Sequence, residues 1–169
     1  VTSDTLPLAS EPTAASVDLV LDAIESAFSR ESLVALLASP HFSLADPPLS
    51  RASLAAFDKI LCDKRYLGDA RRLETLVSDR PDGRGREAAA AALTIVCDLS
   101  PLVEGGAASA LLRQVKAFLT ARWTPLANED PFAARERAAR EAIAEVLVNL
   151  ATAHPSHHDA QWAFVAGRG

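Results

Sequence analysis

The chain has 169 residues, 49% of them hydrophobic, and a formal net charge of −5 at pH 7. This length supports one domain with its own core, and the acidic balance argues against a free-standing nucleic-acid-binding protein. Alanine and leucine dominate while only 5% of residues are aromatic, a composition that favours helices. No apolar run reaches the ~18 residues that cross a membrane, so we expect a cytoplasmic protein without a membrane partner.

The chain is expected to begin with an arm that precedes one helical domain. Residues 1–15 are rich in Ser, Thr and Pro and show no periodicity, which predicts a flexible arm or linker. Residues 16–169 then form a single helical domain. Ser16 is a suitable N-cap for a first helix, whose apolar stripe runs from position 17 to position 28.

A second helix carries the stretch LLASPHF at its end. Ser29 is a suitable N-cap for this helix. We expect it to stop at Ser39, because the residue before a proline resists the α conformation. Phe42 is then placed to fold back onto the core, with His41 exposed beside it.

Three helices are predicted in the middle of the chain. Ser50 caps a helix over residues 51–63, and Asp69 caps a helix over residues 70–78. The charged turn RPDGRGR follows. Residues 87–99 are so uniformly apolar that they predict a central helix.

The last part of the chain predicts two long helices and a short one. Pro101 is expected to begin a turn, which precedes an amphipathic helix over residues 107–122. Asp130 caps a helix over residues 131–153, with proline at its first position, and a short helix is expected around Trp162. The expected apolar face of the long helix is Ala138, Ile143, Val146, Leu147 and Leu150. Because no strand-period segment remains, the predicted fold is all-α, an irregular bundle of about seven or eight helices around one core.

Basic residues concentrate in one segment of this acidic chain. Residues 58–86 hold eight basic and six acidic side chains, whereas the rest holds nine basic and sixteen acidic ones. The segment is either a solvated face with local ion pairs or a surface that contacts phosphates. The candidate phosphate contacts are Arg65, Arg71, Arg72, Arg84 and Arg86.

Sequence motifs of common enzymes are absent, including the phosphate-binding P-loop, the GxGxxG and GxSxG patterns and HExxH. Pro81 and Asp82 form a PD pair without the acid–x–lysine that follows it in nucleases. The HPSHH cluster of His154, His157 and His158 could bind a metal opportunistically, but it is better interpreted as a polar C-terminal loop. We therefore expect no catalytic residue, metal site or cofactor in this chain, and a binding or accessory role.

Other reactive side chains have structural interpretations. Cys62 and Cys97 lie in apolar helical runs and are predicted to be buried, with no metal-ligand spacing around them. Glu141 and Glu145 share a helical face and are expected to be solvated. Trp123 and Trp162 are each expected to be a half-buried anchor near a helix end, with stacking on a nucleic-acid base as the alternative.

The run LVALLASPHF, preceded by LVLDAIESAFSR, resembles the accessory region of AddB/RexB-type helicase–nuclease subunits. It is also similar to a larger bacterial group with a superfamily-1 helicase-like body and a C-terminal PD-(D/E)xK nuclease domain. In those proteins the run opens an all-helical insertion, comparable in place to the 2B subdomain of UvrD-type helicases. ARRLE, the leucine–proline step at Leu99 and Pro101, and LLRQVKAFLTARWTPL extend the resemblance over about residues 16–165.

The resemblance implies an internal domain of a DNA-repair or recombination protein, which fits a chain that starts at Val1. The ATP site and nuclease carboxylates of such families lie outside this region, so no family catalytic residue is carried over. The implied function is that of a non-catalytic accessory domain that positions DNA or a partner subunit. Its partners would be other domains of the parent chain, a helicase–nuclease subunit or, weakly, DNA, and the parent chain would be an ATP-dependent helicase or exonuclease subunit.

Two alternative functions, each from a different class of protein, stay open. One is a helical protein–protein interaction module without a nucleic-acid role, which would show an exposed apolar groove with no basic face beside it. The other is a small all-α enzyme that uses His41 or the HPSHH cluster. That enzyme would need a deep pocket with a histidine and a carboxylate within hydrogen-bonding reach.

Overall fold

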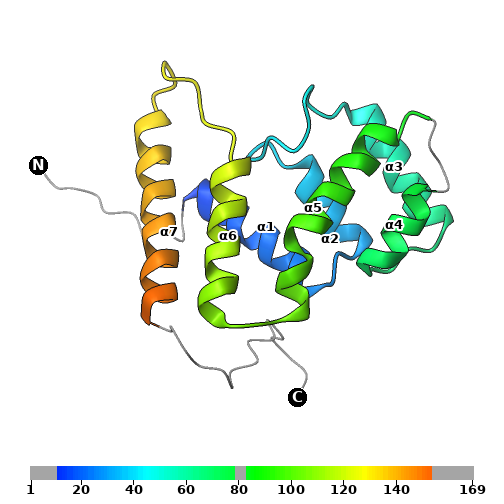
Figure 1. Cartoon of the computed structure of the whole chain (residues 1–169). Helices are drawn as coiled ribbons and strands as arrows, with labels where there is room; N and C mark the ends of the chain where they lie inside the picture. Colours follow the sequence, from blue (N-terminus) through cyan, green and yellow to red (C-terminus); the bar gives the residue numbers. More distant parts are fainter. Residues whose placement is uncertain (1–10, 79–82, 154–169) are drawn as a thin grey trace, which may run out of the picture.

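The computed structural model describes residues 11–78 and 83–153, and these residues form seven helices (Figure 1). This confirms the all-α expectation. In the described part of the chain, the only β-type pairing is an isolated antiparallel bridge between Phe42 and Trp123. The helices are α1 (Pro12–Glu25), α2 (Arg30–Ala38), α3 (Arg51–Asp63), α4 (Ala70–Ser78), α5 (Arg86–Glu104), α6 (Ala108–Arg122) and α7 (Ala133–Ala153).

The starts of α2, α3 and α4 are set by the predicted caps. The side chains of Ser29, Ser50 and Asp69 each accept a hydrogen bond from a backbone N–H in the first turn of the helix that follows. Such a bond satisfies one of the N–H groups that a helix start leaves without a partner. These three helices therefore have the predicted bounds.

The start of α1 differs from the prediction. The helix begins at Pro12, so residues 12–15 of the expected arm are helical, while residues 1–10 lie outside the described residues. Proline suits this position because its fixed φ matches the first helical turn. Ser16 is not a cap but a fully buried residue inside α1, and its hydroxyl donates to the Thr13 carbonyl over 2.6 Å.

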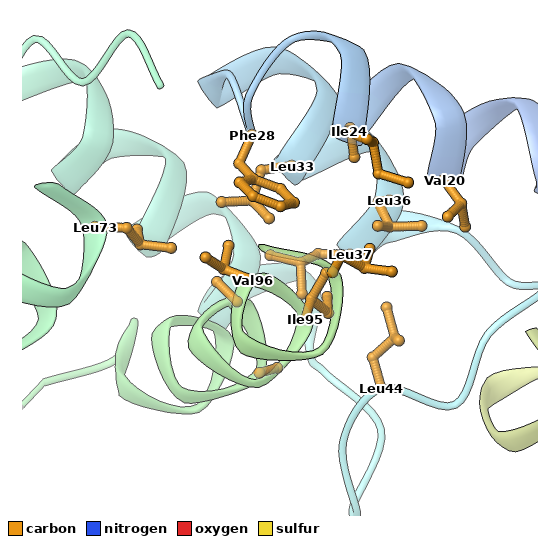
Figure 2. Packing of buried hydrophobic residues seen from close by; sticks show 14 of the residues in the cluster. Val20, Ile24, Phe28, Leu33, Leu36, Leu37, Leu44, Leu73, Ile95 and Val96 are labelled. Atoms are coloured by element: carbon orange, nitrogen blue, oxygen red, sulfur yellow. The ribbon is translucent and has the colours of Figure 1, made fainter. Parts of the chain in front are cut away.

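Helix α5 is the centre of the bundle, as its apolar sequence predicts. It packs on α1, α2, α3, α4 and α6, and Figure 1 shows it between the α6–α7 end of the molecule and the α3–α4 end. Figure 2 shows Ile95 and Val96 of α5 among the side chains of α2, including Leu33 and Leu37, and of Phe28 in the turn between α1 and α2. One hydrophobic core therefore runs through the molecule.

Pro101 does not begin a turn, because α5 continues through it to Glu104. Proline in a helix interior removes a hydrogen bond and costs about 3 kcal/mol. Here Leu102 continues the apolar face of α5 and is only 1% exposed, and burying a leucine side chain contributes about 1.5–3 kcal/mol. The helix ends instead at Gly105, whose φ of 83° favours glycine.

Helix α7 begins two residues later than predicted. The Asp130 carboxylate accepts a hydrogen bond from the Phe132 N–H over 2.8 Å and so caps a turn that leads into the helix. The short helix expected around Trp162 lies outside the described residues.

The apolar face of α7 is narrower than predicted. Ile143 is buried and Leu147 is partly buried, but Val146 and Leu150 are 48% and 43% exposed. Helix α7 lies at the edge of the bundle and packs on α6 and α1 (Figure 1). Because only one side of α7 packs on the bundle, a narrow stripe of small and apolar residues is sufficient for this contact. Among the described helices, none has the length and hydropathy of a membrane span.

Candidate functional site

The structure separates the five candidate arginines into two groups, and all five side chains are exposed. The α4 arginines, Arg65, Arg71 and Arg72, lie on the turn after α3 and in the first turn of α4. The α5 arginines, Arg84 and Arg86, lie at the start of α5.

The two groups lie at different ends of the helix pair α4–α5. The start of α4, with Arg71, borders a hollow shared with Ser100 and Glu104 near the end of α5. The α5 arginines border another hollow, of about 250 Å³, lined by α3 and by Val77 near the end of α4. A nine-residue helix spans about 13 Å, so the five arginines do not form one continuous basic patch.

Two acidic side chains of the basic segment pair with cations other than the candidate arginines. Asp58 pairs with Arg30 over 2.5 Å, and Asp63 pairs with Lys59 over 3.1 Å. Within the described ranges, no salt bridge involves the α4 arginines. The α4 arginines therefore keep exposed positive charge available to an anionic partner.

A hollow of about 600 Å³ lies at the α7 end of the molecule. We call it the α1–α7 groove. Four segments far apart in the sequence build it: the start of α1, the loop after α2, the loop after α6 and the start of α7. Its lining residues are Glu11, Pro12, Thr13, Pro40, His41, Thr124, Pro125, Leu126, Asp130, Phe132, Arg135 and Glu136.

Polar contacts hold the walls of the groove together. The Arg135 guanidinium binds both carboxylate oxygens of Glu11 at 2.7–3.0 Å, joining α7 to the start of α1, and this hydrogen bonding raises the pKa of Arg135. The Leu126 N–H donates to Glu136 over 3.1 Å. The Thr124 N–H donates to the His41 carbonyl over 2.9 Å. The groove is thus a preformed feature of the folded chain.

Arg140 connects α7 to the loop after α6 without lining the groove. Its guanidinium donates to Glu136 over 2.6 Å and to the Thr124 carbonyl, and it lies 5.5 Å from the centre of the Trp123 ring. The Trp123 indole N–H also donates to the Ser16 hydroxyl over 2.9 Å. Trp123 is therefore the half-buried anchor at a helix end that its sequence position predicts.

His41 is half-buried and lines the groove, rather than lying exposed as expected. Phe42 does fold back onto the core, where it is 7% exposed and its ring centre lies 6.2 Å from that of Phe118. In the part of the chain that is described, no hydrogen bond joins the His41 ring to a carboxylate.

The prediction for the cysteines was wrong, because Cys62 and Cys97 are both exposed free thiols. Each follows a buried residue of its helix, and a step of about 100° per residue turns the next side chain toward solvent. Glu141 and Glu145 are exposed as predicted.

Several other candidate residues fall outside the described ranges. The PD pair of Pro81 and Asp82 and the histidines His154, His157 and His158 all lie there. Among the residues that are described, no group of three or more His, Cys, Asp or Glu side chains has an arrangement that could hold a metal ion.

Sequence reasoning missed the α1–α7 groove because no local pattern marks it. Its walls come from four loops and helix starts, each of which looks like an ordinary connection when considered alone. The available signals were weak: Phe132 follows a cap and a proline, and Pro125 and Leu126 lie in a loop between two amphipathic helices.

Comparisons of the chain with protein-family models, with curated proteins and with solved structures gave no match. Functional conclusions therefore rest on the site geometry and on the resemblance described above.

Proposed function

We propose that this chain is an accessory helical domain that binds other macromolecules and catalyses no reaction itself. Its proposed setting is a DNA-repair or recombination helicase–nuclease, where it would position a partner subunit, a neighbouring domain or DNA. One observation supports the binding role above others, namely the preformed apolar α1–α7 groove. The setting is supported by the resemblance of LVALLASPHF and its following helices to the accessory region of such proteins.

The dimensions and lining of the groove suit a binding site. Its volume of about 600 Å³ falls within the ~300–1,000 Å³ typical of ligand pockets. Two large apolar residues in its lining are open to solvent, with Phe132 62% and Leu126 39% exposed. Exposed apolar side chains gathered in a concave site are typical of an interaction surface.

Photocrosslinking in the cells that make the protein tests this role and its setting together. A photoreactive phenylalanine analogue is placed at position 132 in the groove. The matched control carries it at Leu67, which is 87% exposed and lies between α3 and α4, outside the groove. Adducts are identified by mass spectrometry of the crosslinked peptides.

We expect adducts from position 132 to a polypeptide that carries helicase or nuclease motifs, either within the same parent chain or in a partner subunit. Position 67 should give few adducts or different ones. Equal crosslinking from both positions, or the absence of adducts from position 132, would contradict the binding role. Adducts only to proteins unrelated to helicases and nucleases would contradict the setting.

A second candidate role, contact with nucleic-acid phosphates, is favoured by the α4 arginines. Arg65, Arg71 and Arg72 are exposed, and no salt bridge among the described residues involves them. Exposed arginines give sequence-independent contacts with phosphates. With a net charge of −5 on the chain, binding is expected to be weak and to require low salt.

Binding to a forked DNA duplex over a range of salt concentrations tests the phosphate role. The variant R65A/R71A/R72A should bind more weakly, and the slope of log K against log salt should fall by about 0.9 for each phosphate that the variant no longer neutralises. The comparison variant R84A/R86A removes the α5 arginines and shows whether they take part. Binding that is absent, insensitive to salt or unchanged in the first variant would remove the nucleic-acid role and leave the groove role untouched.

A further inference from the structure

The chemistry of the α1–α7 groove indicates what it binds, provided that the binding role proposed above is correct. We propose that the groove takes a large apolar side chain of a partner-protein segment that has a lysine or arginine next to it. The inference rests on the rigidity of the apolar lining, on the charge balance of the groove and on one carboxylate oxygen without a protein donor among the described residues.

The apolar lining of the groove is rigid. Three of its residues are prolines, Pro12, Pro40 and Pro125, and they lie with Leu126 and Phe132. A proline ring fixes φ and offers no backbone N–H, so these residues present apolar surface with little freedom to lose on binding. A preformed lining lowers the entropic cost of association. The volume and lining therefore suit a bulky apolar side chain.

Carboxylates outnumber cations in the groove. Glu11, Asp130 and Glu136 line it together with a single guanidinium, that of Arg135. Because Arg140 pairs with Glu136 from outside the lining, the excess is one negative charge, that of Asp130. This charge disfavours phosphate groups and attracts a cation. Nucleic acid is therefore a poor occupant, and a partner with a basic residue is a good one.

Two of these carboxylates are already engaged within the protein. Both oxygens of Glu11 accept hydrogen bonds from Arg135. One oxygen of Glu136 accepts from Arg140 and the other from the Leu126 N–H. A partner that competed for these oxygens would have to break the contacts that hold the groove walls together.

Asp130 is the carboxylate with capacity for a partner. Its Oδ1 accepts a hydrogen bond from the Phe132 N–H over 2.8 Å, while no donor in the described ranges reaches Oδ2. The Asp130 side chain thus lies close to the exposed Phe132 ring, in the same lining. A segment that inserts an apolar side chain beside Phe132 brings an adjacent lysine or arginine within reach of Asp130, which selects basic over acidic neighbours.

Peptide binding to the whole purified chain tests the inference. The probes are fluorescein-labelled peptides with the central sequences Lys-Trp-Lys, Glu-Trp-Glu and Lys-Ser-Lys in an otherwise identical Gly/Ser background. Affinities come from fluorescence anisotropy, and amide chemical shifts of the ¹⁵N-labelled protein locate the site. Circular dichroism confirms that each protein variant is folded.

We expect the Lys-Trp-Lys peptide to bind most tightly and to shift amides around Leu126 and Phe132. The Phe132→Ser variant should weaken this binding at least about tenfold, a loss of about 1.4 kcal/mol. The Asp130→Asn variant keeps the oxygen that accepts from the Phe132 N–H and should remove the preference for lysine over glutamate. The matched control Leu67→Ser should bind like the unaltered protein.

Four outcomes would overturn the inference. The first two are no binding of the Lys-Trp-Lys peptide at about 1 mM, which corresponds to a binding free energy of about −4 kcal/mol, and equal binding of the lysine and glutamate peptides. The third is unchanged binding of the Lys-Trp-Lys peptide by the Phe132→Ser variant. The fourth is equally tight binding of N-acetyltryptophanamide, which would indicate a small-molecule pocket. The result is separable from the crosslinking test. Adducts from position 132 without a basic preference keep the proposed function and reject this inference alone. The absence of adducts from position 132 rejects the proposed function, and this inference with it.

Discussion

Tyr66 shows how one residue can join two turns of this structure. Its side chain is 2% exposed, and its hydroxyl lies 3.0 Å from the Phe28 carbonyl and 3.2 Å from the Asp69 carbonyl, to which it donates. These carbonyls belong to the turn after α1 and to the residue that caps α4. The turns also meet through a hydrogen bond of 2.9 Å from the Asp69 N–H to the Ala27 carbonyl.

Replacing Tyr66 with phenylalanine is expected to lower the free energy of unfolding by about 1–2 kcal/mol, because the buried Phe28 carbonyl loses its side-chain donor. The ring still fills its site, so little packing is lost. Urea denaturation followed by circular dichroism measures the difference. A loss below about 0.3 kcal/mol would mean that the hydroxyl does not tie the two turns together.

The pH dependence of stability gives a second measure of the same residue. Burial, with a smaller contribution from the charge of Asp69, raises the pKa of Tyr66 from 10.0 to about 12. Between these values the unfolded chain binds fewer protons than the folded one, so stability falls as the pH rises. Below about pH 10 the contribution is fully present. In urea titrations at about pH 9, 10 and 11, the Tyr66→Phe variant should lose less stability with rising pH than the unaltered protein does.

At the scale of elements, the Glu136–Arg140 ion pair attaches α7 to the loop after α6, a role that the sequence of α7 alone does not indicate. The side chains of both residues are 14% exposed. Together they hold the Thr124 carbonyl and the Leu126 N–H. The pair therefore fixes the loop after α6 against α7, which the i,i+4 spacing alone does not reveal.

Replacing Arg140 with methionine is expected to destabilise the protein by about 3 kcal/mol, because Glu136 is left as a mostly buried charge without its cation. The matched control is Arg137→Met, an exposed position on the same helix, with an expected change below about 0.5 kcal/mol. Amide hydrogen exchange should quicken in α7 for the first variant. Equal stability of the two variants would show that the pair does not support the helix.

Helix bounds were predictable where local chemistry sets them and not where burial does. Ser29, Ser50 and Asp69 cap helices through bonds that span two or three residues, so sequence spacing finds them. The prediction for Pro101 was wrong because α5 continues past it to bury Leu102 against neighbouring helices, which offsets part of the local cost of proline and cannot be read from local sequence. The predicted start of α1 was wrong for a similar reason, since Ser16 serves Trp123 across the fold and does not cap its own helix.

At the scale of the whole molecule, α5 packs against helices at both ends of the bundle. Leu99 in this helix is 0% exposed and belongs to the single core cluster, which includes Leu73 of α4 and Phe118 of α6. A cavity at this position therefore weakens both ends of the molecule together.

The Leu99→Ala variant is expected to lose about 2–5 kcal/mol, the range for buried leucine truncations. Val103→Ala, at a position on the same helix that is 42% exposed, should change stability by less than about 0.5 kcal/mol. Thermal unfolding is followed by circular dichroism and by tryptophan fluorescence. We expect the two midpoints to fall together in Leu99→Ala, and midpoints that separate would contradict a single cooperative core.

The fold class followed from composition and periodicity, whereas the candidate site did not. The α1–α7 groove requires Glu11 beside Arg135 and His41 beside Thr124, and no sequence pattern places these residues together. The five arginines show the opposite case, in which residues close in sequence are not close in space. The length of α4 lies between the α4 arginines and the α5 arginines, so the basic segment does not form one surface.

The ion pair between Glu11 and Arg135 joins residues 124 positions apart. One wall of the α1–α7 groove therefore leaves the ribosome well before the other. A nascent chain that has not yet released α7 carries Pro12 and Pro40 but has no binding site. Under the binding role proposed above, a partner that requires the complete groove would not recognise a chain whose synthesis stops before α7, because the α7 wall of the groove would be missing.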